Sequence, residues 1–285
     1  MANEKENMMA ESKTVKSVKT AISAVLILYT FITLFLIGNT VLSSFKSKQE
    51  LINHTIGFPK KFTLENYYTL LFEKGFTRYF INSLTLVFCS LILLLLVSTM
   101  AAYGLSRFEF KGRGLLQTYF LIGLMFPIQL GILPLFVMLT KIHLNNNIFG
   151  LTLLYAANMS FPVLVFSRFF RGIPHSLIES ARIDGAKEHK VFIKIILPMS
   201  RPVLFTIGLI NFVMIWNDFY MPLVFLTKSS VRTLTLAIYS YMANFLANWH
   251  MVFAAVVIAL LPVIIVFLRF SDQIVAGLVG GAIKE

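Results

Sequence analysis

The chain has 285 residues, of which 57% are hydrophobic and 13% charged, and its mean hydropathy is +0.78. Soluble globular domains carry about 25% charged residues, so this composition excludes an ordinary soluble domain and indicates an integral membrane protein. The formal net charge of +12 would suggest a nucleic-acid partner in a soluble protein. Basic loops also orient membrane spans and contact anionic lipid, so we expect the lipid bilayer, and no nucleic acid, as a partner.

Six apolar stretches are long enough to cross a bilayer, which takes roughly 20 helical residues. We therefore predict an all-α membrane protein with a transmembrane domain over residues 18–272 and polar tails at 1–17 and 273–285. The predicted spans, in chain order, cover residues 18–43, 80–105, 115–139, 148–170, 203–226 and 251–270. The last four contain proline, which suits kinked helices around a pathway and equally suits irregular packing.

The topology follows from span number and charge. The first stretch is longer than the apolar core of a typical signal peptide, and no Ala-x-Ala site closes it, so we expect a retained span. An even number of spans places both termini on one side, and most of the 25 lysines and arginines fall there, which predicts cytosolic termini. The first external loop, residues 44–79, is long and also basic, and it can form a small external cap.

The loop between the fourth and fifth predicted spans, residues 171–201, is charged and carries helix signals. Pro174 suits the first turn of a helix, which we predict over His175–Ile183. Gly185 predicts the turn that ends it, because glycine adopts positive φ at little cost, and a second short helix is predicted over 187–196. The mixture of apolar and charged side chains suits either an interfacial helix with snorkelling basic residues or a surface buried against another protein.

Family resemblance favours the second interpretation of this loop. Its spacing resembles the "EAA" loop of permease subunits in ATP-binding-cassette (ABC) importers, with Ser180 at the usual middle alanine; the matching residues are Glu179, Ala181, Gly185, Ile195, Leu197 and Pro198. Similar pieces occur at 101–107 with 110–112, at 216–219 with 222–223, and at 277–284. Over nearly its whole length the chain is similar to sugar-type permeases related to the shorter maltose permease subunit.

This resemblance implies a type I ABC importer permease fold, with six transmembrane helices and a cytosolic coupling helix. It implies a complex in the cytoplasmic membrane of a bacterium or archaeon: this chain, a second and different permease subunit, two ABC ATPase subunits and an external solute-binding protein. The residues implied for ATPase coupling are Glu179, Ser180, Ala181, Asp184, Gly185 and Ala186. The glycine-rich tail with Gly280, Gly281 and Lys284 is implied to contact the ATPase, although a frayed terminus has the same composition.

No catalytic or metal site is predicted. The chain lacks the Gly-x4-Gly-Lys-Ser/Thr loop that cradles nucleotide phosphates. No cysteine and histidine spacing suits a metal. We therefore expect no enzyme activity and no cofactor bound by this chain, with ATP and Mg²⁺ held by the partner ATPase subunits.

Polar residues inside the spans are candidates for the substrate pathway. An ionised carboxylate at mid-bilayer costs about 2.5–3.5 kcal/mol, so Asp218 is expected to be paired, to face a cavity, or to lie near the outer interface. Beside it, Asn217 and Trp216 offer the hydrogen bonds and aromatic face that sugars use. Asn158 and Asn211 suit either a pathway or hydrogen bonds between helices.

The sequence thus predicts a permease subunit that imports a carbohydrate, with an oligosaccharide as the expected class. Its alternating access would be driven by a separate ATPase through the loop helix. Two alternatives remain open: an ion-coupled secondary transporter, and an importer permease for a solute other than sugar. The first would need several ionisable groups inside the membrane, and the spans offer essentially Asp218.

Overall fold

The structure, a computed structural model, describes the backbone of residues 2–242 and 245–282 and the side chains of residues 16, 18–242 and 248–270. Over these residues every regular element is a helix, which confirms the predicted all-α class. Three helices are long and apolar enough to cross a membrane, and the number rises to 6 if each of three bent pairs is one span. The chain divides into two compact units, residues 1–73 with 241–258 and residues 74–240 with 259–285.

The first unit contains one long apolar helix and a folded segment that follows it. Helix α1 (Ala2–Ser44) includes the candidate span Val18–Ser44. No residue in the most apolar 18-residue stretch of this span is buried. After it come α2 (Lys48–Asn53), α3 (Glu65–Tyr68) and the π-helix η1 (Thr69–Glu73). Fully buried Lys46 donates from Nζ to the carbonyl of His54 at 3.0 Å, so the segment predicted as an external loop is locally folded.

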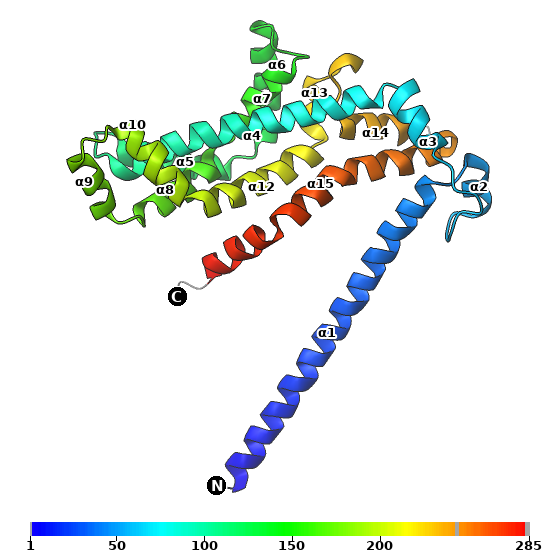
Figure 1. The fold of residues 1–285 in the computed structure, drawn as a ribbon, viewed down its shortest axis with the longest axis horizontal. Coiled ribbons are helices and arrows are strands. Elements are labelled where there is room, and N and C mark those ends of the chain that lie inside the picture. The colour runs from blue at the N-terminus through cyan, green and yellow to red at the C-terminus, as the bar shows by residue number, and fades with distance from the viewer. Residues whose placement is uncertain (1, 243–244, 283–285) are drawn as a thin grey trace. The chain divides into compact units, whose positions relative to one another are not determined.

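The second unit is organised around α4 (Phe76–Arg107), the long helix that crosses Figure 1. It packs against α7 (Ile148–Ala157), α8 (Ser160–Arg171) and α12 (Arg201–Asn217). Its inward face carries small polar and apolar side chains such as Ser98 and Ala102, both fully buried, so neighbouring helices approach closely.

The other elements of this unit are short. They are α5 (Arg113–Met125), η2 (Ile128–Gly131), α6 (Ile132–Lys141), α9 (His175–Ile183), α10 (Glu188–Val191), η3 (Phe192–Ile196), α11 (Leu197–Met199), α13 (Tyr220–Phe225), η4 (Ser229–Val231) and α14 (Leu234–Met242), the last two residues of which belong to the first unit. The final helix, α15 (Phe245–Ala282), contains the candidate span Asn248–Phe270 and has residues in both units.

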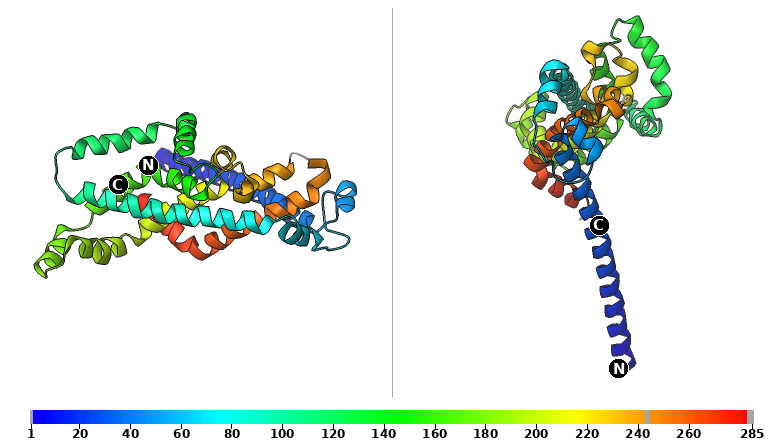
Figure 2. Two further views of the ribbon diagram at one scale, coloured as in Figure 1. Left: turned by 90° about the horizontal axis from the view of Figure 1, so that it is seen from above. Right: turned by 90° about the vertical axis from the view of Figure 1, so that its right-hand side faces the viewer.

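Two predicted spans are bent in the structure, and a third bend lies just before the fifth predicted span. The pair α5 and η2–α6 bends by 93°, and the change of direction between the two helices can be followed in Figure 2. The pair α7 and α8 bends by 48° at Asn158, and the segment 188–199 meets α12 at 75°. The segment predicted as the fifth span, 203–226, is interrupted: α12 ends at Asn217 and α13 begins at Tyr220.

Candidate functional site

The charged loop 171–201 is fixed to the helical bundle by one face of a short helix. Helix α9 begins after Pro174 and has the bounds that the sequence predicts, His175–Ile183. Its buried side chain, Ile178, is only 2% exposed. It packs in an apolar cluster with side chains of α4, α8, α10, η3 and α12. Burial of this side chain holds the helix in place and leaves its other face open.

The end of α9 is a tight turn that depends on small residues. Gly185 has φ +78°, and its N–H donates to the carbonyl of Arg182 at 3.0 Å. The N–H of Ala186 donates to the carbonyl of Ala181 at 2.9 Å, and both alanines pack against the apolar cluster. These two bonds form a Schellman motif, in which the left-handed residue is usually glycine. Three of the six predicted coupling residues therefore have a structural role in shaping this turn.

The remaining predicted coupling residues lie on the open face of α9. Glu179, Ser180 and Asp184 are exposed, and the Ser180 hydroxyl donates to the carbonyl of Ser176 within the helix at 2.9 Å. Beside them Ile183 is 86% exposed. The exposed face of α9 therefore combines a large apolar side chain with carboxylates.

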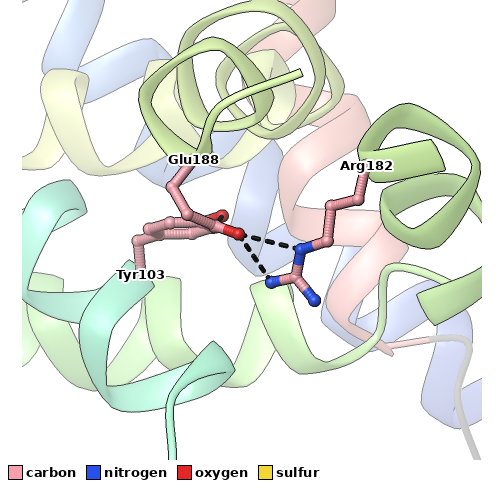
Figure 3. A network of polar contacts seen from close by, with 3 residues as sticks. All are labelled: Tyr103, Arg182 and Glu188. Atoms are coloured by element: carbon pink, nitrogen blue, oxygen red, sulfur yellow. Dashed lines mark hydrogen bonds and ion pairs between the residues drawn. The ribbon is translucent and has the colours of Figure 1, made fainter. Parts of the chain in front are cut away.

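A polar network that the sequence analysis missed connects α9 to the longest helix of the unit (Figure 3). Glu188, the first residue of α10, receives a hydrogen bond from the Tyr103 hydroxyl at 2.7 Å and one from Arg182 Nε at 2.8 Å. Tyr103 lies in α4 and Arg182 in α9. No local pattern could have paired residues 103 and 188, although the acidic residue at the start of α10 is an ordinary helix signal.

A second connection between α4 and the loop comes from its last residue. Arg107 donates from Nη2 to the carbonyl of Ile173 at 2.9 Å and also to the carbonyl of Phe170. Phe170 is in the last turn of α8, where carbonyl groups lack partners within the helix. The guanidinium therefore closes the end of α8 and fixes the start of the loop.

Asp218 is paired, as its place in an apolar segment requires. Its Oδ2 accepts from the Tyr155 hydroxyl at 2.8 Å, and its Oδ1 accepts from the N–H groups of Tyr220 at 2.8 Å and Met221 at 3.3 Å. The carboxylate therefore caps the start of α13, ends α12, and joins this break to the last turn of α7. Sequence reasoning selected Asp218 but did not identify Tyr155.

We expect an Asp218→Ala variant to lower the thermal unfolding temperature in detergent. The substitution removes the acceptor for the hydroxyl of the buried Tyr155, and a buried donor left unpaired costs about 1–3 kcal/mol. It also removes the acceptor for the N–H groups of Tyr220 and Met221. Asn217→Ala is the matched control, because the exposed Asn217 amide bonds only to Val213 of its own helix. Equal melting temperatures for the two variants would show that the Asp218 contacts do not stabilise the break.

The other pathway candidates lie in different surroundings. Trp216 is 4% exposed, stacks with Phe212 at 6.1 Å and donates from Nε1 to the carbonyl of Ala259 at 3.1 Å, so its ring faces are covered. Asn211 is buried and donates to the carbonyl of Ile207 in its own helix. Asn158 is exposed at the α7–α8 bend. The structure therefore brings Asn217 and Asp218 together at one break and leaves Trp216 and Asn211 within helix packing.

An apolar cavity of about 580 Å³ lies between α4, α12 and α15. Phenylalanine and leucine side chains dominate its lining, with Arg201 and Thr206 as polar members. None of the five predicted pathway residues lines it, and its chemistry does not suit a sugar, which needs several hydrogen-bonding partners. Of the predicted tail contacts, Gly280 and Gly281 are in the last turns of α15, beyond the described side chains, and Lys284 lies outside the described residues.

The part of the chain that matches known proteins includes both the loop 171–201 and the break at Asp218. Residues 94–279 match the family described as "Binding-protein-dependent transport system inner membrane component". The "Diacetylchitobiose uptake system permease protein NgcG" of Streptomyces coelicolor is 34% identical over 264 residues, which are 92% of this chain and 87% of that protein. The "Arabinooligosaccharides transport system permease protein AraQ" of Bacillus subtilis is 32% identical over 286 residues, which cover 97% of this chain and 100% of that protein. A solved bacterial ABC transporter that imports the acidic polysaccharide alginate has the same fold, with a TM-score of 0.78 at 23% identity over 90% of this chain and 96% of that chain.

Proposed function

This chain belongs to the family of binding-protein-dependent transport system inner membrane components, and we propose that it is the permease subunit of an ATP-driven carbohydrate importer. The predicted importer permease fold is confirmed by this membership and by the fold shared with the alginate transporter. Oligosaccharides are the proposed substrate class. The two sugar-transport relatives support it, because their names specify diacetylchitobiose and arabinooligosaccharides.

The observation that carries the proposed mechanism is that α9 is packed against the bundle on one face and exposed on the other. One face is fixed to the bundle through Ile178, and the other presents Glu179, Ile183 and Asp184 to solvent. A helix held in this way can receive a displacement from a second protein and pass it to the membrane helices. We propose that α9 is the coupling helix and that it lies in a groove of a partner ATPase, with the loop on the cytosolic side.

The partners follow from this mechanism. Two ATPase subunits bind ATP and Mg²⁺, a second and different permease subunit completes the pathway, and an external binding protein delivers the sugar. The family description, which makes transport dependent on a binding protein, supports the last of these. ATP binding closes the ATPase pair, the coupling helices move with it, and the bundle changes from inward-open to outward-open. Hydrolysis resets the state, so this chain supplies the moving element and not the chemistry.

The pathway and the orientation complete the proposal. Asn217 and Asp218 are the polar groups proposed to face the solute, with Asn158 at the neighbouring bend. Trp216 and Asn211 contribute only if the transport cycle uncovers them. The termini are proposed to be cytosolic, with Gly280, Gly281 and Lys284 reaching the ATPase.

Reconstitution tests the proposed function. The chain is co-expressed with permease, ATPase and binding-protein subunits from the same organism, purified as a complex, and placed in liposomes with ATP inside and a panel of labelled oligosaccharides and amino acids outside. We expect stoichiometric copurification of an ATPase and uptake of an oligosaccharide that requires both ATP and the binding protein. Solute accumulation by this chain alone, without nucleotide, would contradict the proposal, as would ATP-dependent uptake of amino acids alone.

A further inference from the structure

We propose that Glu188 is a positioning residue that links the motion of the coupling helix α9 to the membrane helix α4. This inference rests on the proposed function and adds to it the route by which displacement enters the bundle. Figure 3 shows the arrangement: the Glu188 carboxylate lies between Arg182 on one side and Tyr103 on the other. One carboxylate thus joins side chains from three helices, α4, α9 and α10.

The two carboxylate oxygens have separate partners. Oε2 accepts from the Tyr103 hydroxyl at 2.7 Å, and Oε1 accepts from Arg182, with both Nε and Nη2 at 2.8 Å. Bonds to a charged acceptor are short and directional, and a guanidinium that presents two nitrogens to one oxygen is restricted in orientation. Arg182 therefore cannot shift by more than a fraction of a bond length without moving the carboxylate or breaking the contact.

The apolar contacts of α9 do not provide such a constraint. Ile178 holds α9 against the bundle through burial, which is non-directional and so adds no hydrogen-bond direction to that contact. Tyr103 is different, because the residue is 7% exposed and its ring has an edge-to-face contact with Phe108 at 5.7 Å and a tilted contact with Phe192 at 5.1 Å. The hydroxyl therefore projects from a rigid site in α4 toward Glu188.

The exposure of the ion pair argues that its role is positional. The side chains of Arg182 and Glu188 are 46% and 41% exposed, and ion pairs of this kind contribute little to stability because water screens them. An ion pair that adds little to the stability of the fold but fixes the relative orientation of two helices acts mainly on how those helices move together. Loss of the link should therefore affect coupling much more than folding.

The test measures sugar transported per ATP hydrolysed by the complete importer in liposomes. Tyr103→Phe removes one oxygen and keeps the ring contacts, so it cuts the link at α4. Arg182→Met keeps the aliphatic stem and cuts the link at α9. We expect each variant to lower the transport ratio by about fivefold or more, the size of a typical coupling between sites. The double variant should be no worse than either single variant, because both cut the same connection.

Tyr119→Phe is the matched control, because Tyr119 lies in α5 with an exposed ring and its change leaves this network intact. Glu188→Gln, which keeps an oxygen for Tyr103, should lose less coupling than Glu188→Ala. A normal transport ratio in Tyr103→Phe overturns the inference, and so does a double variant whose loss is the product of the single losses. Failure of Tyr103→Phe to copurify the ATPase also overturns it, because the link would then serve docking. Absence of ATP-dependent uptake by the unchanged chain would instead refute the proposed function.

Discussion

A Gly185→Pro variant is expected to lose ATP-driven uptake while still inserting in the membrane. Gly185 has φ +78°, whereas proline is confined to φ near −65°, so the turn that ends α9 cannot form. Proline also removes the N–H that donates to Arg182. With both bonds of the Schellman motif disturbed, α9 no longer holds its exposed face at a fixed angle. The measurement is uptake in liposomes beside the amount of folded protein, from size-exclusion chromatography in detergent.

Two further substitutions in the same loop are compared with Gly185→Pro in the same uptake assay. Gly185→Ala places a methyl group where no atom lies within 4 Å, so its penalty comes from the backbone alone, about 1–2 kcal/mol. We expect partial uptake. Ser180→Ala should retain full uptake, because it removes only a bond from an exposed hydroxyl to its own helix. Normal uptake by Gly185→Pro would mean that the shape of this turn does not matter for coupling.

A Gly150→Ala variant is expected to destabilise the second unit strongly. An added Cβ at Gly150, in the first turn of α7, would lie 2.1 Å from the carbonyl oxygen of Leu144. That atom belongs to the backbone and cannot swing aside, so α7 or the preceding turn must move. Overpacking of this kind costs about 1–3 kcal/mol, and the cost rises when the backbone must shift.

The measurement for Gly150→Ala is thermal unfolding of the purified protein in detergent, together with its yield in the membrane fraction. Gly104→Ala is the matched control, since Gly104 is also helical and an added Cβ there meets nothing within 4 Å. Alanine in an open helical position should be neutral or slightly stabilising. If the two variants melt at the same temperature, the close approach of α7 to Leu144 does not constrain the fold.

Local signals in the sequence predicted the loop well. Pro174 and Gly185 mark the two ends of α9, and the structure places the helix over His175–Ile183, as expected. The reason is that capping and positive φ are properties of single residues, which need no knowledge of the rest of the chain. The long helices α1, α4 and α15 were predicted for a similar reason, since their length and composition alone identify them.

Long-range pairings could not be predicted in this way. The contact between Tyr103 and Glu188 joins positions 85 residues apart, and the Tyr155–Asp218 contact joins positions 63 apart. Trp216 shows the related difficulty: its position beside two polar residues suggested a sugar-stacking face, whereas Phe212 and the carbonyl of Ala259 occupy its ring and nitrogen. The sequence left open whether Asp218 lies within a span or near the outer interface, because apolar residues continue on both sides of it; the structure places it at the break between α12 and α13.

The bond between Tyr155 and Asp218 joins the C-terminal end of α12 to α7. Helix α12 has 17 residues, so at 1.5 Å per residue it extends about 25 Å from this contact. A tilt of about 10° about this end would move the opposite end, near Arg201, by about 4 Å. A small change in the tilt of α12 at one end therefore corresponds to a displacement at the other end that is comparable to the length of a side chain.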